Sequence, residues 1–229
     1  MAGGIMKIRF VTEGSLNEYW EGAKRADCDL LVFGFDGLGE VDYRRELAGE
    51  TSKLEDMAIL SREAGCTVVS GCFTDSCGVR HKSAAIAEKG RILGVADMLH
   101  VTEPNEFKSG AHLKVYETAA GKIGLCVGED LYFPSVCESL ALFDADVIVS
   151  VFGAAEDAVP QLMMRACAFS SGVNVCMCAA GIAQIASPDG DIRMRAARRE
   201  CDFEFVPARE YRLTTVRTRA LSQKKREDY

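Results

Sequence analysis

The chain has 229 residues, 48% of them hydrophobic, and its formal net charge of −7 is spread along the sequence. This length provides a full hydrophobic core for one large domain or two small ones. Basic charge clusters only at Lys224, Lys225 and Arg226, so the basic face that nucleic-acid binding requires is absent and nucleic acid is excluded as a partner.

The sequence also argues against a membrane or secreted protein. No apolar run approaches the about 20 residues of a membrane-spanning helix, and residues 1–10 lack the apolar centre of a signal peptide. We therefore expect a cytoplasmic protein that does not contact a membrane. There, the ten cysteines are expected to be reduced and buried. Their spacing matches no zinc motif, and with three histidines neither a metal nor a cofactor is expected.

Apolar patterning predicts strands that alternate with helices and hairpins. Strands are expected at residues 6–12, 29–35, 66–72, 83–87, 92–95, 114–117, 123–127, 145–152, 173–179 and 204–208, with a further hairpin at 185–192. Helices are expected at residues 16–25, with Ser15 as N-cap, and at 51–64, 135–143 and 158–171. Several strands are apolar throughout, which indicates that both of their faces are covered. The pattern predicts an α/β fold of two packed mixed sheets with helices outside, in a single domain over residues 1–229.

The stretch GLCVGEDLYFP, residues 124–134, is the centre of this plan. Its apolar run ends at Gly128, two acids follow, and Phe133-Pro134 then introduces a helix. A strand that turns sharply into a helix points backbone N–H groups at one spot, and in an enzyme such an elbow presents a nucleophile. Gly128 has no side chain, so this elbow carries no nucleophile.

The motifs and their order resemble the nitrilase, or carbon–nitrogen hydrolase, family over nearly the whole chain. Four segments carry the resemblance: the apolar strand 29–35, the stretch 90–101, Gly121-Lys122-Ile123-Gly124, and 130–134. The resemblance implies a four-layer α-β-β-α sandwich of two mixed sheets. It also implies a homodimer, because family members usually pair through the helices that flank the sheets and the C-terminal strand.

In that family a Glu deprotonates a Cys, the thiolate attacks an amide or nitrile carbon, and a Lys with backbone N–H groups stabilises the oxyanion. The positions that match this triad here are Phe35, Met98 and Gly128. A benzyl ring accepts no proton, a thioether carries no charge, and glycine offers no nucleophile. The resemblance therefore implies the family's fold without its catalytic triad.

Two nearby residues are candidates to replace the missing nucleophile and base. Cys126 lies two residues before Gly128, and so on the same face of an ideal strand, roughly 6–7 Å further into the sheet. We expect it to be a buried core cysteine, whose thiol is inert. Asp36 follows Phe35, is expected to point to the opposite face, and is interpreted as the cap of a turn.

Three further acidic residues lie near the motifs, and each is interpreted separately. Glu103 matches the family acid that orients the Lys, and without that Lys it is either a lone pocket carboxylate or a solvent-facing acid in a loop. Glu129 replaces an aromatic residue, and it either caps the helix near Pro134 or adds negative charge to the cleft. Asp130 is interpreted as a turn acid.

The leading hypothesis is a nitrilase-fold protein that has lost its chemistry and acts as a binding, regulatory or partner subunit. The alternative is a divergent amide hydrolase that uses Cys126, with Glu103 or Asp36 as base. A third hypothesis is a redox or metal-handling role for the cysteines. If the cleft is open, Phe35, Met98 and the backbone at Gly128 favour a small, largely apolar ligand.

Overall fold

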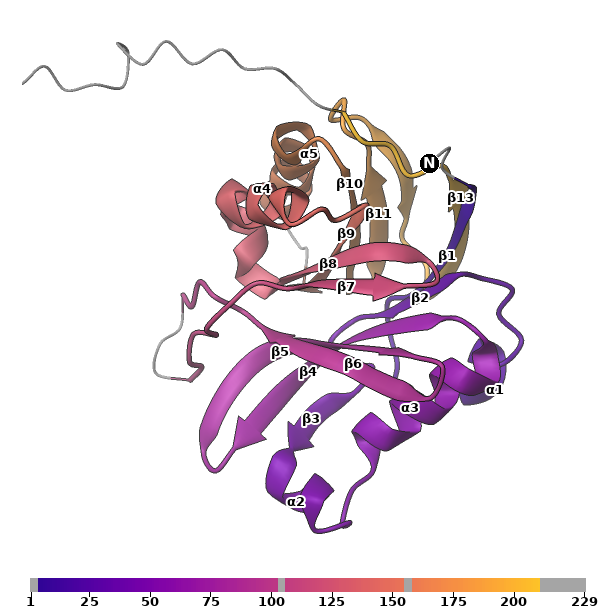
Figure 1. The fold of residues 1–229 in the computed structure, drawn as a ribbon, viewed down its shortest axis with the longest axis vertical. Coiled ribbons are helices and arrows are strands. Elements are labelled where there is room, and N and C mark those ends of the chain that lie inside the picture. Colours follow the sequence, from indigo (N-terminus) through magenta and orange to yellow (C-terminus); the bar gives the residue numbers. More distant parts are fainter. Residues whose placement is uncertain (1–3, 103–105, 155–157, 211–229) are drawn as a thin grey trace, which may run out of the picture.

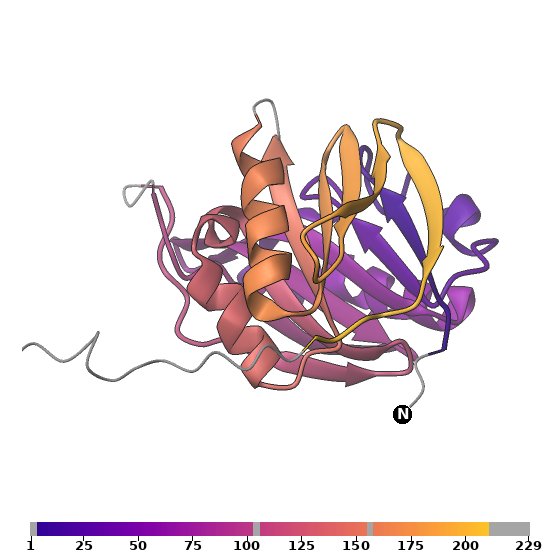
Figure 2. The same cartoon turned by 90° about the horizontal axis from the view of Figure 1, so that it is seen from above.

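The computed structural model describes residues 4–102, 106–154 and 158–210. Within these residues two mixed sheets pack face to face, and helices cover their outer faces (Figures 1 and 2). The first sheet runs in the order β13 (Glu200–Phe205), β1 (Met6–Val11), β2 (Leu30–Phe33), β4 (Thr67–Ser76), β5 (Val79–Glu88) and β6 (Arg91–Asp97), with β3 (Gly39–Asp42) paired to β4. The second runs in the order β12 (Ile192–Ala196), β11 (Ile182–Ala186), β10 (Asn174–Ala180), β9 (Val147–Ala154), β8 (Gly121–Val127) and β7 (Val115–Thr118).

The helices form the two outer layers. Helices α1 (Trp20–Ala23), α2 (Tyr43–Leu47) and α3 (Lys53–Ala64) lie beside the first sheet, while α4 (Pro134–Leu142) and α5 (Val159–Ser171) cover the second (Figure 1). Three apolar cores result: one between the two sheets, one under α4 and α5, and one under α1 and α3. The predicted α/β fold of two mixed sheets is confirmed.

Parallel pairing explains the continuous apolar runs. β9 lies between β8 and β10 and is parallel to both. β2 lies in the same way between β1 and β4. Each of these central strands has one face on the core between the sheets and the other on a helix layer, so neither face tolerates charge.

The structure corrects several predicted boundaries. The helix expected at 16–25 is reduced to α1, because Leu16 is buried and its N–H donates to the Gly37 carbonyl at 2.8 Å, which holds 15–19 in a turn. Ser15 still accepts the Glu18 N–H, at 3.2 Å. The last strand is β13 instead of 204–208, because alternate residues from Cys201 pack on the core between the sheets. β3 and α2 were not predicted.

Candidate functional site

The elbow begins where β8 ends at Val127. Gly128 has a φ of 53°, a left-handed conformation that glycine adopts without strain. A 3₁₀ turn (Gly128–Tyr132) follows, and Pro134 occupies the first turn of α4, where its missing N–H is not needed. The predicted turn from strand to helix at Gly128 is therefore present.

The space in front of Gly128 is taken by a side chain. A Cβ atom on Gly128 would lie 2.9 Å from Sδ of Met98 and 3.7 Å from Cδ of Lys82. Met98 is only 1% exposed and belongs to the core between the sheets. A nucleophile at position 128 would require this packing to change.

Aromatic packing surrounds Phe35, the position that the motif match assigns to the general base. Phe35 is buried, and its ring stacks on Phe73 with centroids 5.1 Å apart. Phe73 in turn stacks on Phe107 at 5.8 Å. A Cβ on Gly71 would lie 2.8 Å from the Phe35 Cα, so glycine permits the close approach of β4 to this residue. Phe35 and Met98 both belong to the core between the sheets, and both side chains are buried.

An ion pair that sequence reasoning missed lies beside the elbow. Nζ of Lys82, on β5, lies 2.7 Å from Oε1 of Glu129, and both side chains are mostly buried. The same ammonium lies 5.3 Å from the ring centroid of Phe107, within the range of a cation–π contact. Oε2 of Glu129 is buried without a hydrogen-bond partner. The carboxylate next to Gly128 is thus held by a lysine and does not face a thiol.

A signal for this pair exists in the sequence of β5. Lys82 shares a strand face with Ala84 and Ile86, two residues of the core between the sheets. A lysine whose side chain points toward the core needs a charged or hydrogen-bonding partner there. No side chain caps α4, so the structure gives Glu129 a place in the ion pair and none as the helix cap.

Asp130 fixes the loop that follows β6. Its carboxylate accepts the backbone N–H of Leu99 at 2.9 Å and that of His100 at 2.8 Å, and it lies 2.8 Å from Nδ1 of His100. The imidazole of His100 stacks on Phe133 with centroids 3.8 Å apart. These contacts hold the residue next to Met98 against the elbow, in agreement with the reading of Asp130 as a turn acid.

Cys126 lies on the other side of the sheet. It is fully buried in the core under α4 and α5, and its thiol contacts that of Cys137, a hydrogen bond that raises the pKa of Cys137. The expectation that Cys126 shares the face of Gly128 was wrong, because the positive φ of Gly128 ends the alternation of the strand at that residue. The expected burial of Cys126 is observed.

The remaining candidates are not brought into the site. Asp36 is exposed next to buried Phe35, in the turn that follows β2. Glu103 lies outside the described residues. In the described ranges, no three or more His, Cys, Asp or Glu side chains converge in a way that would hold a metal ion. None of the helices described there has the length and apolar character to cross a membrane.

Comparison with known proteins identifies the family. The sequence profile of the family described as carbon-nitrogen hydrolase matches residues 13–202. A probable nitrilase of Schizosaccharomyces pombe is 28% identical over 128 residues, which are 53% of this chain and 47% of that protein, so the match spans about half of the relative.

Solved structures share the fold at low identity. A cysteine-to-alanine mutant of an amidase from Nesterenkonia AN1, of the nitrilase superfamily, superposes with a TM-score of 0.74 at 17% identity and 92% coverage of both chains. A carbon-nitrogen hydrolase of Helicobacter pylori G27 gives 0.72 at 16% identity, with 90% of both chains covered.

Proposed function

Because this chain belongs to the carbon–nitrogen hydrolase family, we propose that it is a member without the family's catalysis, which acts as a binding, regulatory or partner subunit. The observation that carries the proposal is the contact between Met98 and Gly128. The thioether fills the volume in which a nucleophilic side chain would sit.

The chemistry of the remaining residues supports this proposal. Covalent catalysis on an amide needs an accessible thiolate, a base within hydrogen-bond reach and donors aimed at the oxyanion. Lys82 and Glu129 supply a cation and a carboxylate, but each neutralises the other at 2.7 Å. The thiol nearest in sequence, on Cys126, faces the helix layer.

The alternative is an amide hydrolase that uses Cys126. That reading requires a substrate to reach a fully buried thiol beneath α4 and α5. It also requires Asp36, which is exposed, or Glu103 to serve as its base. The geometry favours the non-catalytic proposal over this alternative.

The test combines turnover with thiol labelling. The purified protein is incubated with a panel of amides and nitriles, then with a thiol-directed probe, and adducts are mapped by mass spectrometry. We expect no turnover and no selective adduct at Cys126. Turnover that Cys126→Ala abolishes would overturn the proposal, and Cys176→Ala, which removes another fully buried thiol, is the matched control.

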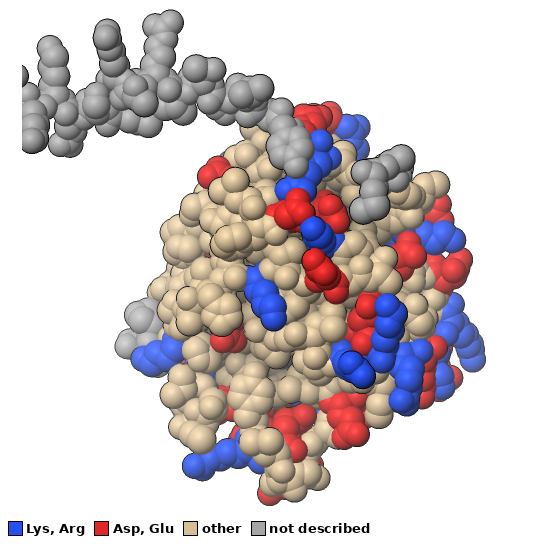
Figure 3. All heavy atoms as spheres, in the orientation of Figure 1, with Lys and Arg blue, Asp and Glu red and all other residues tan. Residues whose placement is uncertain are grey.

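We also propose that the partner surface is the outer face of α4 and α5, with a second copy of this chain as the occupant. Leu142 is 85% exposed, Phe143 58% and Leu162 61%. In Figure 3 the part of the surface over these helices, at the upper left, carries few charged side chains. Contiguous apolar surface of this kind is typical of protein interfaces.

This surface is tested by mass measurement in solution. Light scattering after size-exclusion chromatography is expected to give a dimer, and Leu162→Glu is expected to give a monomer. Leu47→Glu is the matched control, because Leu47 is 89% exposed on α2, in the other helix layer. A monomeric parent protein, or a dimer that Leu162→Glu leaves intact, would contradict the proposed interface.

A further inference from the structure

Two thiols meet at the amino ends of neighbouring strands, far from the elbow. Cys28 precedes β2 and Cys66 precedes β4, and these strands pair in parallel with Leu30 opposite Thr67. The Thr67 N–H donates to the Asp29 carbonyl at 3.0 Å, which ties the two strand ends together. Cys28 and Cys66 therefore lie on adjacent strand ends.

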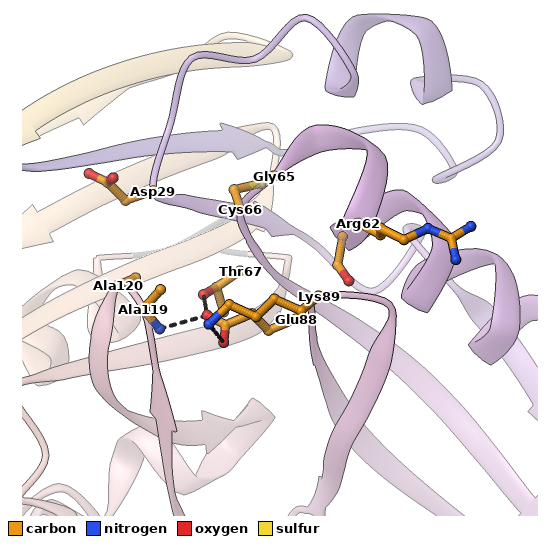
Figure 4. Close-up of a pocket in the computed structure, with 10 residues that line it drawn as sticks. Asp29, Arg62, Gly65, Cys66, Thr67, Glu88, Lys89, Ala119 and Ala120 are labelled. Atoms are coloured by element: carbon orange, nitrogen blue, oxygen red, sulfur yellow. Dashed lines mark hydrogen bonds and ion pairs between the residues drawn. The ribbon is translucent and has the colours of Figure 1, made fainter.

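One of the two thiols belongs to the wall of a cavity of about 220 Å³. Figure 4 shows Cys66 and Gly65 at the top of this cavity, with Glu88 and Ala119 below them. The lower wall is fixed, because Oε1 of Glu88 accepts the Ala119 N–H at 2.6 Å and the Thr67 hydroxyl at 2.8 Å. The cavity therefore gives a small molecule room beside Cys66.

The surroundings divide the two thiols into different roles. The hydrogen bond from Cys66 and the nearby Arg9 guanidinium lower the pKa of Cys28, although burial opposes them. The same hydrogen bond, together with burial, raises the pKa of Cys66. Cys28 is half-buried and Cys66 is buried. Cys28 is thus the thiol that solvent reaches more easily.

We propose that Cys28 and Cys66 form a reversible redox pair, which a low-molecular-weight disulfide oxidises to an intramolecular disulfide. The thiolate of Cys28 attacks one sulfur of the small disulfide, the S–S bond breaks, and one small thiolate leaves. Cys66 then gives its proton to that thiolate, and its sulfur attacks Sγ of Cys28. The second small thiolate leaves and takes a proton from water. Two protein thiols are oxidised and one small disulfide is reduced to two thiols.

The cysteines under the outer helices and Cys77 lack either access for a small molecule or a neighbouring thiol. Cys137 hydrogen-bonds with Cys126 and Cys167, but all three are buried under the outer helices. Cys77 is exposed, yet its sulfur accepts from the Arg44 guanidinium at 3.1 Å and no thiol contact is seen for it in the described residues. Cys28 and Cys66 lie on adjacent strand ends, Cys28 is half-buried, and Cys66 adjoins the cavity.

Oxidised glutathione is the probe for the test. The reduced native protein is incubated with it and quenched in acid, and its peptides are mapped without reduction. We expect peptides joined through Cys28 and Cys66, with two hydrogens lost and no glutathione retained at either residue. The oxidised protein should also unfold at a higher urea concentration than the reduced protein, because the new bond closes a long loop.

Two variants separate the roles of the thiols. Cys66→Ser is expected to trap glutathione on Cys28, whereas Cys28→Ser should leave Cys66 reduced. Cys77→Ser is the matched control and should leave the new bond unchanged. The proposal is overturned if Cys28 and Cys66 stay reduced while Cys77 takes up glutathione. It is also overturned if glutathione remains on Cys28 in the parent protein, or if the Cys28→Ser variant accumulates it on Cys66.

Discussion

Replacing Gly128 by alanine tests the packing at the elbow directly. Two independent effects of the substitution lower the free energy of unfolding. A residue with a side chain at a φ of 53° costs about 1–2 kcal/mol. The added methyl group would also lie 2.9 Å from Sδ of Met98, and such overpacking in a core costs about 1–3 kcal/mol. We expect Gly128→Ala to lower the free energy of unfolding by roughly 2–5 kcal/mol in total.

The chain provides a control in which only the cost of the positive φ applies. Gly49 also has a positive φ, of 72°, but a Cβ there meets no atom within 4 Å. Gly49→Ala should therefore lower the free energy of unfolding by about 1–2 kcal/mol. Urea unfolding at one protein concentration measures both variants.

The double variant with Met98→Ala isolates the cost of overpacking against the thioether. In that background the thioether is gone, so Gly128→Ala should cost no more than Gly49→Ala does. The difference between the two backgrounds is the coupling energy of the contact, expected at about 1–3 kcal/mol. Equal losses in Gly128→Ala and Gly49→Ala, with Met98 present, would refute the conclusion that Met98 fills the space of a nucleophile.

Three further predictions concern single side chains. Lys82→Met leaves both carboxylate oxygens of Glu129 without a partner and should destabilise the fold by about 1–3 kcal/mol; adding Glu129→Gln should recover part of this loss in urea unfolding, and no recovery would argue against the ion pair. Asp130→Ala removes the acceptor of two backbone N–H groups and should cost about 2–4 kcal/mol, whereas a loss below 1 kcal/mol would show that the loop holds itself. Burial and the hydrogen bond with Glu200 raise the pKa of Tyr19 from 10.0 to about 12, so its contribution to stability is complete below pH 10 and is lost as the pH rises through 12. Between pH 9 and pH 11 the free energy of unfolding should therefore fall by roughly 1 kcal/mol less in Tyr19→Phe than in the parent protein. An equal fall in both proteins would contradict the raised pKa.

The sequence predicted those parts of the fold that follow from local pattern. Doubly buried strands such as β9 and β10 are visible as unbroken apolar runs, and the glycine after α3 marks its end. The assignment of the triad-equivalent positions to Phe35, Met98 and Gly128 stays a prediction, and the structure places each of them just beyond the end of a strand. The single-domain organisation and the cytoplasmic location stay predictions.

The parts that were missed depend on how distant segments pack. Lys82 and Glu129 are 47 residues apart. Lys82 lies on β5 of the first sheet and Glu129 in the turn after β8 of the second, so their pairing follows only once the sheets are packed together. The face of Cys126 was misjudged because a strict two-residue period was carried through Gly128, where the backbone turns. β3 and α2 contain one fully buried apolar side chain between them, that of Val41, and so give no periodic signal.

The pairing of β1 with β13 has a consequence for synthesis on the ribosome. Met6 lies opposite Phe205, and the guanidinium of Arg9 pairs with the carboxylate of Asp202. β1 therefore keeps one edge of bare N–H and C=O groups until nearly two hundred more residues have been translated. During that interval the nascent chain has an edge open to other strands, and a transcript truncated before Glu200 leaves it exposed permanently.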